Sequence, residues 1–587
     1  MKKLAEQATI QSFLNCYLRE TENYREEDSA IYFSKDENVT KAIIIPLKSQ
    51  HIQLITGISY WSETGRHLFA FPLYYQVIGK EDLIPLDYVT LTAAITKELL
   101  LEQNRLDSED ELMLRVILSC KNIEHYLQKR GDEEKDFTTF IEAEQSLLLG
   151  HLLHPTPKSK QGITTEEEEI YSPELKGSFQ LDYFKAHKTI VAQDSSLKQS
   201  AANLLKEELK KDMSISQSFL KEHAENPDYI LIPAHPLQSK ILLEKPEVKE
   251  LMAAEKLIYL GAHGQAFSAT SSMRTVYSKH SSFMFKFSVP VKITNSLRVN
   301  LQKELDRGVE VGRLLQTKLG DLLNENNPGF SVIQDPAYLN IEGVPGFEVV
   351  FRENPFSKNE DVTLIAGLCQ DDPFKGKTKL ERVIRQLAEK EERTTEQVSK
   401  DWFTRYLSLS LEPLYWLYEN YGLALEAHQQ NSVVKLENGY PIHFYYRDNQ
   451  GYYYAESKAN ELKSLLPELS MKSETICTQD VAEERFRYYF FFNHLFGLIN
   501  GFGAARLIEE SKLLNLLSEK LEELANKSTY AASLLRSLLD EKKLPCKANL
   551  LTRFHDMDEL VGSLETQSVY TMIKNPLYQR EASLYEV

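Results

Sequence analysis

The chain has 587 residues, which is too long for one hydrophobic core, so we expect two or three domains. With 42% hydrophobic and 26% charged residues, its composition is that of an ordinary globular protein. The formal net charge of −18 disfavours a nucleic-acid partner and suits a cationic substrate, although many proteins are simply acidic. Five widely spaced cysteines without a CxxC pair exclude a disulfide framework and a zinc knuckle.

The N-terminus reaches Glu6 before any apolar run can form, so no signal peptide is expected. The longest apolar runs fall far short of the ~20 residues that cross a bilayer. We therefore expect a cytoplasmic protein without a membrane partner.

Residues 1–150 predict a mixed first domain. The segment Ala5–Tyr24 has helical spacing, Ile43–Leu47 and Ile52–Gly57 have the character of strands, and Leu86–Leu118 returns to helical spacing. The charged stretch that begins at Thr164 is typical of a solvated loop or the start of a helix.

Residues 151–375 carry the alternating segments 230–233, 268–298 and 346–352, which predict an antiparallel sheet. Residues 376–587 are mainly helical: one apolar face runs from Trp402 to Tyr418 before Gly422, and a second runs from Leu513 to Leu524. The fold class is therefore α+β, with predicted domains 1–150, 151–375 and 376–587.

The common nucleotide-binding signatures are missing. Gly376-Lys-Thr ends like a phosphate loop, but Asp371 stands where the first glycine is needed. Gly501-Phe-Gly503 lacks a third glycine and follows a helical pattern. Any ATP site must therefore be of a less common kind.

Two clusters suit an anionic ligand. His154-Pro-Thr-Pro-Lys158 presents an imidazole and an ammonium from a rigid turn, although an ordinary proline-rich turn would look the same. The second cluster combines hydroxyl groups with cationic side chains, although a polar edge strand would have a similar sequence. Its residues are Ser268, Thr270, Ser271, Ser272, Arg274, Thr275, Lys286, Lys292, Thr294, Asn295 and Arg298. Arginine forks pair with carboxylate or phosphate, and hydroxyls add neutral hydrogen bonds.

Two further clusters suit a metal or a cleft. Glu426-Ala-His428-Gln-Gln430-Asn431 has the alternate spacing of a strand or tight loop, and Glu426 is a candidate Mg²⁺ ligand. Asp448 follows a hydrophobic strand, which is where phosphoryl-transfer sites hold metal, although Arg447-Asp448 alone would more often be a surface pair.

The remaining histidines point less clearly to function. His235 is more simply part of a structural turn, and His494 a buried, hydrogen-bonded core residue. His151 and His154 suggest a metal pair, but no further ligands follow at zinc-like spacing.

These clusters, in this order, resemble the IucA/IucC family of NRPS-independent siderophore synthetases over essentially the whole chain. The matching motifs are His154-Pro-Thr-Pro-Lys158-Ser, Ala269-Thr-Ser-Ser-Met-Arg-Thr, Lys286…Lys292-Ile-Thr-Asn…Arg298, Glu426-Ala-His-Gln-Gln-Asn, Arg447-Asp448 and Lys547-Ala-Asn-Leu. Within the family, the chain looks closest to the petrobactin-pathway members that join citrate to spermidine, through passages such as Glu142-Ala-Glu-Gln-Ser and Tyr171-Ser-Pro-Glu-Leu.

The resemblance implies a cupped-hand fold with an N-terminal thumb, sheet-bearing fingers and a helical, distantly kinase-like palm. It implies an ATP- and Mg²⁺-dependent ligase, commonly a homodimer, that adenylates a citrate carboxylate, releases pyrophosphate and condenses the acyl group with an amine. The alternatives are a citrate ligase for lysine or a diamine, a kinase-like phosphotransferase and a non-catalytic citrate-binding protein.

The resemblance also implies residue roles. His428, Arg298 and Lys286 are the expected catalytic residues. ATP is expected to contact His154, Lys158, Ser271, Ser272, Arg274, Thr275, Lys286 and Gln430. Citrate is expected to contact Thr294, Asn295, Arg298 and His428. Glu426 and Asp448 are the expected metal ligands, with a hold on the substrate ammonium as their alternative role, and Asn431 would support the site.

Overall fold

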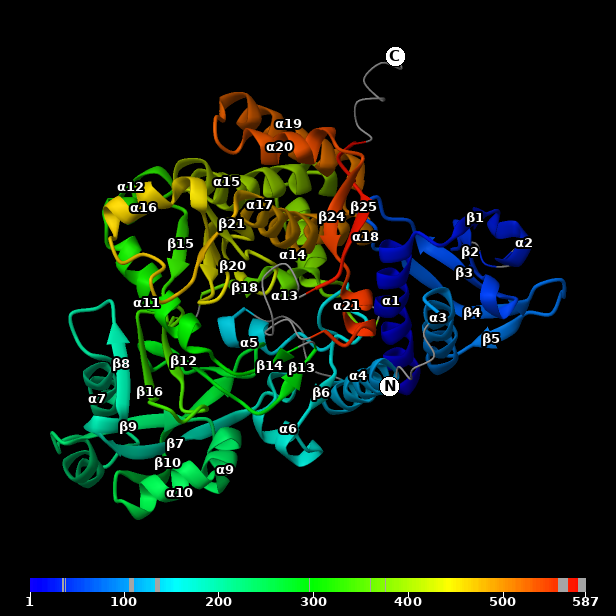
Figure 1. Cartoon of the computed structure of the whole chain (residues 1–587). Coiled ribbons are helices and arrows are strands. Elements are labelled where there is room, and N and C mark those ends of the chain that lie inside the picture. The colour runs from blue at the N-terminus through cyan, green and yellow to red at the C-terminus, as the bar shows by residue number, and fades with distance from the viewer. Residues whose placement is uncertain are drawn as a thin grey trace.

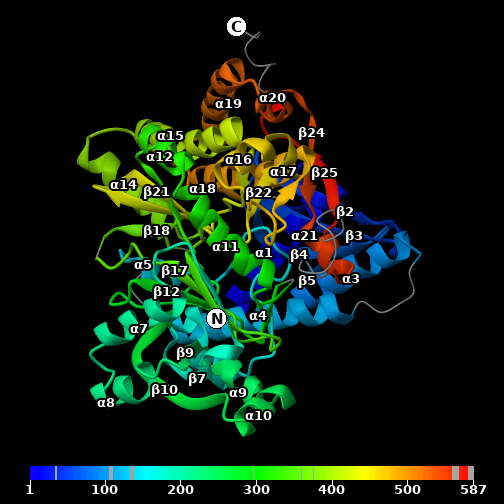
Figure 2. The ribbon, with the colours of Figure 1, turned by 60° about the vertical axis from the view of Figure 1, so that its left-hand side comes forward.

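A computed structural model describes residues 1–33, 36, 38–104, 110–131, 138–294, 296–358, 360–374, 376–557 and 568–578. Three parts surround a common centre in Figures 1 and 2: the N-terminal part in blue, a large sheet in cyan and green, and a helical C-terminal part in yellow to red. This arrangement confirms the predicted α+β class.

The N-terminal part is a five-stranded antiparallel sheet packed against helices. Its strands run in spatial order β1 (Arg25–Glu27), β2 (Lys41–Leu47), β3 (Ile52–Tyr60), β4 (Leu68–Val77) and β5 (Ile84–Leu86). Its helices are α1 (Lys2–Thr21), α2 (Ser29–Phe33), α3 (Tyr88–Glu102), α4 (Asp110–Arg130) and α5 (Phe140–Glu144). The apolar faces of α1, α3 and α4 share a core with β2 and β3.

The helical spacing predicted over Leu86–Leu118 is divided between two helices. The side chain of Asp87 accepts a hydrogen bond from the backbone N–H of Thr90 and starts α3, and α4 is a separate helix that continues to Arg130. The two helices have the same apolar spacing, so periodicity alone did not distinguish them.

The middle part is an eight-stranded antiparallel sheet, as predicted. Its strands run in spatial order β8 (Val191–Ser195), β16 (Ala337–Ile341), β17 (Val349–Glu353), β12 (Phe283–Phe287), β11 (Thr275–Tyr277), β10 (Leu257–Ala269), β7 (Ser178–His187) and β9 (Tyr229–Ala234). Shorter strands β6 (Lys160–Gln161), β13 (Lys292–Ile293) and β14 (Ser296–Leu297) form a second sheet. The helices are α6 (Thr165–Tyr171), α7 (Ala201–Lys211), α8 (Gln217–Phe219), α9 (Pro236–Glu244), α10 (Pro246–Ala253), α11 (Gln302–Leu315) and α12 (Lys318–Asn326).

The C-terminal part surrounds the long helix α15 (Thr395–Tyr421), whose predicted apolar face from Trp402 to Tyr418 is buried. Gly422 ends this helix with φ 61°, a left-handed conformation that glycine adopts easily. The other helices are α13 (Ile365–Cys369), α14 (Lys379–Lys390), α16 (Ala459–Leu465), α17 (Gln479–Phe486), the π-helix η6 (Arg487–Leu495), α18 (Phe496–Ala504), α19 (Glu510–Lys527), α20 (Ala532–Asp540) and α21 (Asn549–Phe554). The predicted leucine stripe is the buried face of α19, and His494 is a buried core residue.

The C-terminal part also contains strands. A four-stranded sheet has the order β15 (Phe330–Ile333), β21 (Tyr440–Arg447), β20 (Ser432–Glu437) and β18 (Val362–Leu364). Two smaller sheets are built from β19 (Leu423–Leu425), β22 (Tyr452–Ala455) and β23 (Ile476–Cys477), and from β24 (Lys543–Lys547) and β25 (Tyr570–Lys574).

The sheets do not follow the expected domain limits everywhere. Strands β15 and β18 precede residue 376 in the chain but pair with β21 and β20. At the other end, α21 lies beside α1 (Figure 1), where the carboxylate of Glu20 accepts the N–H groups of Leu550 and Leu551. The division into 1–150, 151–375 and 376–587 stays a prediction.

None of the helices in the described ranges is both long and apolar enough to span a membrane. All five cysteines are free thiols, and four of them are buried.

Candidate active site

A cavity of about 750 Å³ lies where the three parts meet, a volume suited to a small-molecule ligand. All the predicted site residues that the structure describes line it: His154, Lys158, Ser271, Ser272, Arg274, Thr275, Lys286, Thr294, Arg298, Glu426, His428, Gln430 and Asp448. Asn295 lies outside the described residues. The fold therefore brings motifs from across the sequence to one place.

The hydroxyl run forms a fixed turn between β10 and β11. The backbone N–H of Thr275 donates to the Ser272 hydroxyl at 3.2 Å, and Met273 adopts φ 65°. The amide of Gln430 donates to the Ser271 hydroxyl at 3.0 Å, which joins the turn to the loop after β19. Arg274 Nη1 donates to the carbonyl oxygen of Val299 at 2.8 Å, so its guanidinium is held in place at the cavity wall.

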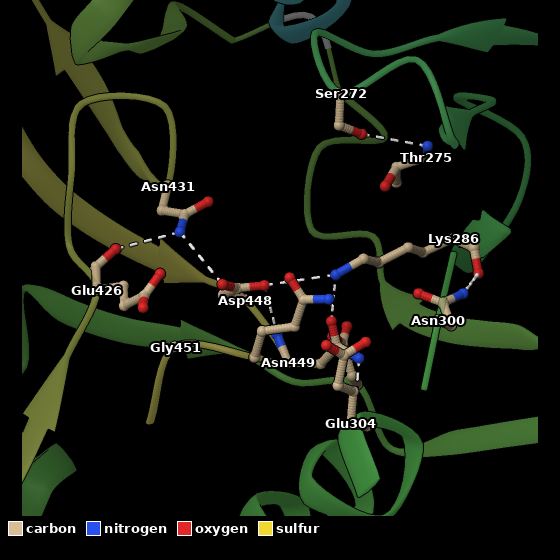
Figure 3. Close-up of polar contacts among 12 residues, drawn as sticks. Ser272, Thr275, Lys286, Asn300, Glu304, Glu426, Asn431, Asp448, Asn449 and Gly451 are labelled. Atoms are coloured by element: carbon tan, nitrogen blue, oxygen red, sulfur yellow. Dashed lines mark hydrogen bonds and ion pairs between the residues drawn. The ribbon is translucent and has the colours of Figure 1, made fainter. Parts of the chain in front are cut away.

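Lys286 and Asp448 meet at the centre of the site (Figure 3). The Lys286 ammonium lies 3.4 Å from Asp448 Oδ1 and also donates to the side-chain oxygen of Asn449. Asn431 Nδ2 donates to Asp448 Oδ2 at 3.4 Å from the opposite side. Both charged side chains are largely buried, so the alternative reading of Asp448 as part of a surface pair was wrong.

These contacts set the ionisation of the pair. Burial opposes ionisation of Asp448, but Lys286 and Arg352 outweigh it and hold the pKa of Asp448 well below its usual range. Burial, with repulsion from Arg274, lowers the pKa of Lys286 to about 8 despite Asp448. Asp448 is therefore an ionised carboxylate that is largely buried.

Glu426 and His428 lie on a tight loop between β19 and β20. The Glu426 carboxylate accepts a hydrogen bond from the Tyr453 hydroxyl, and burial followed by repulsion from Asp448 raises its pKa. Burial lowers the pKa of His428 to about 4, and its Nδ1 accepts the backbone N–H of Gln430 at 3.2 Å. His428 is therefore neutral near pH 7.

The donors around Asp448 fit a magnesium ion that has few protein ligands. Within the described part of the chain, no group of three or more acids, histidines and cysteines is arranged to hold a metal. Mg²⁺ usually takes one or two carboxylates and completes its shell with substrate phosphates and water. Asp448 and Glu426 supply such a partial set, and a bound cation would also favour the ionised form of Glu426.

Arg298 lines the cavity together with Thr294 and His428. Its Nη2 donates to the carbonyl oxygen of Ile293 at 3.2 Å and lies 3.4 Å from the Thr294 hydroxyl. The local backbone thus orients the guanidinium. Lys547, from the motif Lys547-Ala-Asn-Leu, lines the same cavity.

The turn at 154–158 is rigid, but Lys158 is already paired. Its ammonium lies 2.6 Å from one oxygen of the buried Glu174, and Lys160 lies 2.8 Å from the other. Burial opposes ionisation of Glu174, yet the two lysines lower its pKa to about 2. The contact between Lys158 and an ATP phosphate therefore stays a prediction. It requires the Lys158 ammonium to bind the phosphate while it remains paired with Glu174.

Glu144 is a buried site residue that sequence reasoning missed. Its carboxylate accepts the backbone N–H of Ser271 at 2.9 Å and forms an ion pair with Arg447 at 2.5 Å. Arg447 in turn donates to the carbonyl oxygen of Gln430 at 3.0 Å. Glu144 thus fixes the hydroxyl turn to the end of β21, yet in sequence it is one of two acids in a short helix.

Arg66, on the loop between β3 and β4, was also missed. It brings the N-terminal part to the cavity wall, where its Nη1 donates to Asn500 Oδ1 at 3.0 Å. No motif surrounds Arg66 in the sequence, so a contact with residue 500 had no local signal.

Comparison with known proteins adds to this geometry. Residues 139–370 match the sequence model of the IucA / IucC family, and residues 400–562 match the model described as ferric iron reductase FhuF-like transporter. The chain is 46% identical to the spermidine-citrate ligase of Bacillus anthracis, over 99% of both proteins. It is 36% identical to the rhizobactin siderophore biosynthesis protein RhbC of Rhizobium meliloti, over 98% of both. The solved structure of ATP-bound aerobactin synthetase IucA from Klebsiella pneumoniae superposes with a TM-score of 0.87 at 28% identity, covering 98% of this chain and 100% of that one.

Proposed function

The chain belongs to the IucA/IucC family, and from this premise we propose that it is an ATP-dependent ligase that joins citrate to spermidine in the synthesis of a petrobactin-type siderophore. The observation that carries the proposal is that one cavity unites a fixed hydroxyl turn, the ionised Asp448 and the Arg298 fork. These features suit phosphate, a divalent cation and carboxylate, respectively. The relative with 46% identity is named for the same two substrates.

The first step is adenylation. Arg298, Thr294 and His428 hold citrate so that one carboxylate oxygen attacks the α-phosphorus of ATP, while the bond from that phosphorus to pyrophosphate breaks. Ser272, Arg274, Thr275 and Lys286 bind the phosphates and stabilise the charge that develops on them. Mg²⁺, held by Asp448 and Glu426, would neutralise part of the phosphate charge when bound.

The second step is amide formation. A neutral primary amine of spermidine attacks the acyl carbon of citryl adenylate, the bond from that carbon to AMP breaks, and the amine nitrogen releases a proton. The cavity walls hold the two reactants together, which supplies much of the rate enhancement. Because the amine must be neutral, the rate should rise as the pH becomes mildly basic.

We expect spermidine to be the preferred amine. With citrate and Mg-ATP, amine-dependent release of pyrophosphate and AMP should be most efficient with spermidine and lower with putrescine, cadaverine and lysine. The measurement is kcat/KM for each amine at matched pH and salt, with the amide product identified by mass spectrometry. Highest efficiency with lysine would exclude spermidine as the preferred substrate, and ADP in place of AMP would indicate a phosphotransferase.

Replacing Arg298 by alanine should impair citrate use more than ATP use. A charged hydrogen bond in a partly dry site contributes about 1.5–3 kcal/mol, so KM for citrate should rise roughly tenfold to a hundredfold. Arg298→Lys should restore little, because an ammonium cannot make the planar fork. Normal citrate kinetics of the lysine variant would contradict the assignment of Arg298 to the citrate site.

The proposal extends to location and assembly. A ligase that consumes ATP is expected in the cytoplasm, where the five free thiols would also stay reduced. We propose a homodimer, and the mass of the purified protein in size-exclusion chromatography with light scattering tests it.

A further inference from the structure

Three histidines of the cavity share one hydrogen-bonding pattern. In each, Nδ1 accepts the backbone N–H of the residue two positions later: His151 from Leu153 at 3.0 Å, His154 from Thr156 at 3.1 Å and His428 from Gln430 at 3.2 Å. A ring nitrogen that accepts an N–H carries no proton, so the proton of the neutral imidazole lies on Nε2. The local turn therefore fixes the tautomer and leaves Nε2–H as the donor.

His151 has a different environment from an ordinary surface histidine. Its side chain is exposed where it lines the cavity. The protein that surrounds the cavity, followed by repulsion from His154 and His428, lowers the pKa of His151 from its usual value. Its ring is therefore neutral near pH 7.

The surroundings of His151 favour an anion. The positive charges of Arg19 and Lys547 act on its ring. On His428, the negative charge of Asp448 is opposed by the positive charges of Arg447, Lys547 and Arg298. The rings of His151 and His154 lie 6.4 Å apart. A carboxylate placed here would gain the attraction of several cations, and a neutral N–H donor would bind it without adding another repulsive charge.

We propose that His151 is a further substrate-contacting residue, whose Nε2–H donates a hydrogen bond to a carboxylate oxygen of citrate on the side of the cavity lined by His428, Arg298 and Lys547. This assignment rests on the proposed citrate ligase function. It adds His151 to the predicted citrate contacts. The sequence alone had suggested for this residue only a metal pair with His154 that lacked further ligands.

Two substitutions at position 151 separate the structural role of Nδ1, which accepts the Leu153 N–H, from the proposed ligand contact of Nε2. Asparagine at position 151 can accept the Leu153 N–H through Oδ1, as in an Asx turn, but has no donor at the position of Nε2. Glutamine can place an amide N–H near the position of Nε2 but does not reproduce the turn acceptor. His187 offers a matched control, because its Nδ1 also accepts an N–H two residues on, from Thr189 at 3.4 Å, outside the residues that line the cavity.

The experiment measures KM for citrate and for ATP from citrate-dependent pyrophosphate release, together with the melting temperature, for the full-length wild type, H151N, H151Q and H187N. We expect H151N to melt like the wild type and to raise KM for citrate roughly tenfold to a hundredfold, with KM for ATP nearly unchanged. H151Q should recover part of the citrate affinity, and H187N should behave as the wild type.

Three results would overturn the assignment: an unchanged citrate KM in H151N, a parallel loss of citrate and ATP affinity with a lower melting temperature, or better citrate use by H151N than by H151Q. Failure of the wild type itself to consume citrate would instead reject the underlying ligase function. ¹⁵N spectra of the histidine rings give a readout independent of activity, since the proposal requires the proton of His151 on Nε2 before citrate is added.

Discussion

Asp448→Asn is expected to lower kcat/KM roughly a thousandfold, because the proposed mechanism uses this carboxylate to hold the metal, and its loss would remove several kcal/mol of transition-state charge stabilisation. The amide can still accept the backbone N–H of Asn449, which Asp448 Oδ1 accepts at 2.7 Å, so the local backbone should persist. The variant loses the negative charge of the carboxylate that Lys286 and Asn431 contact in the wild type.

The measurement is pyrophosphate release as a function of Mg²⁺ concentration, with Mn²⁺ binding in the presence of ATP followed by electron paramagnetic resonance. Asp228→Asn is the matched control, since it also breaks an aspartate–lysine pair, with Lys188 at 2.8 Å, but on the exposed surface. The control should retain activity. Wild-type metal affinity and rate in Asp448→Asn would show that Asp448 neither holds the metal nor stabilises the reaction.

Glu174→Gln is expected to lower the free energy of unfolding by about 3–5 kcal/mol at pH 7, because it leaves the buried ammonium of Lys158 without its carboxylate and removes the nearer of the two carboxylates beside Lys160, which keeps Glu168 at 3.5 Å. Glu174 is buried and holds Lys158 and Lys160, at 2.6 and 2.8 Å. Its folded-state pKa of about 2 lies below the value of about 4.3 expected in the unfolded chain. The stabilisation is therefore full above about pH 4.3 and is lost as the pH falls toward 2.

Urea denaturation of the wild type and the variant between about pH 2.5 and pH 8 measures this difference across the window of the Glu174 titration. Glu244→Gln is the control, because it breaks an exposed pair with Lys249, at 2.8 Å, and should change stability little. A difference between wild type and Glu174→Gln that is no larger than for the control would mean that the buried pairs contribute no net stability. A difference that grows as the pH falls below 4.3 would contradict the assigned direction of the pKa shift.

The sequence predicted much of the local structure and most of the candidate site. Helical spacing predicted α1, α15 and α19, and alternating segments predicted strands of the eight-stranded sheet, because burying one face imposes a period on the sequence. The clusters at 154–158, 268–298, 426–431 and 447–448 predicted the cavity residues, since phosphate, carboxylate and divalent cations each require particular donor groups. Asn295, the remaining residue of this set, lies outside the described residues.

Only the tertiary structure decided how these groups are paired and what completes the cavity. Glu144 meets Arg447, Arg66 meets Asn500, and Lys158 is held by Glu174, contacts in which burial of both partners fixes the geometry. No local pattern encodes such pairs, because a carboxylate in a short helix has the same sequence signature whether it faces water or a distant arginine. The same reasoning applies to ionisation: Asp448 is ionised and His151 is neutral because the fold places each beside particular charges, and residue order alone does not specify that environment.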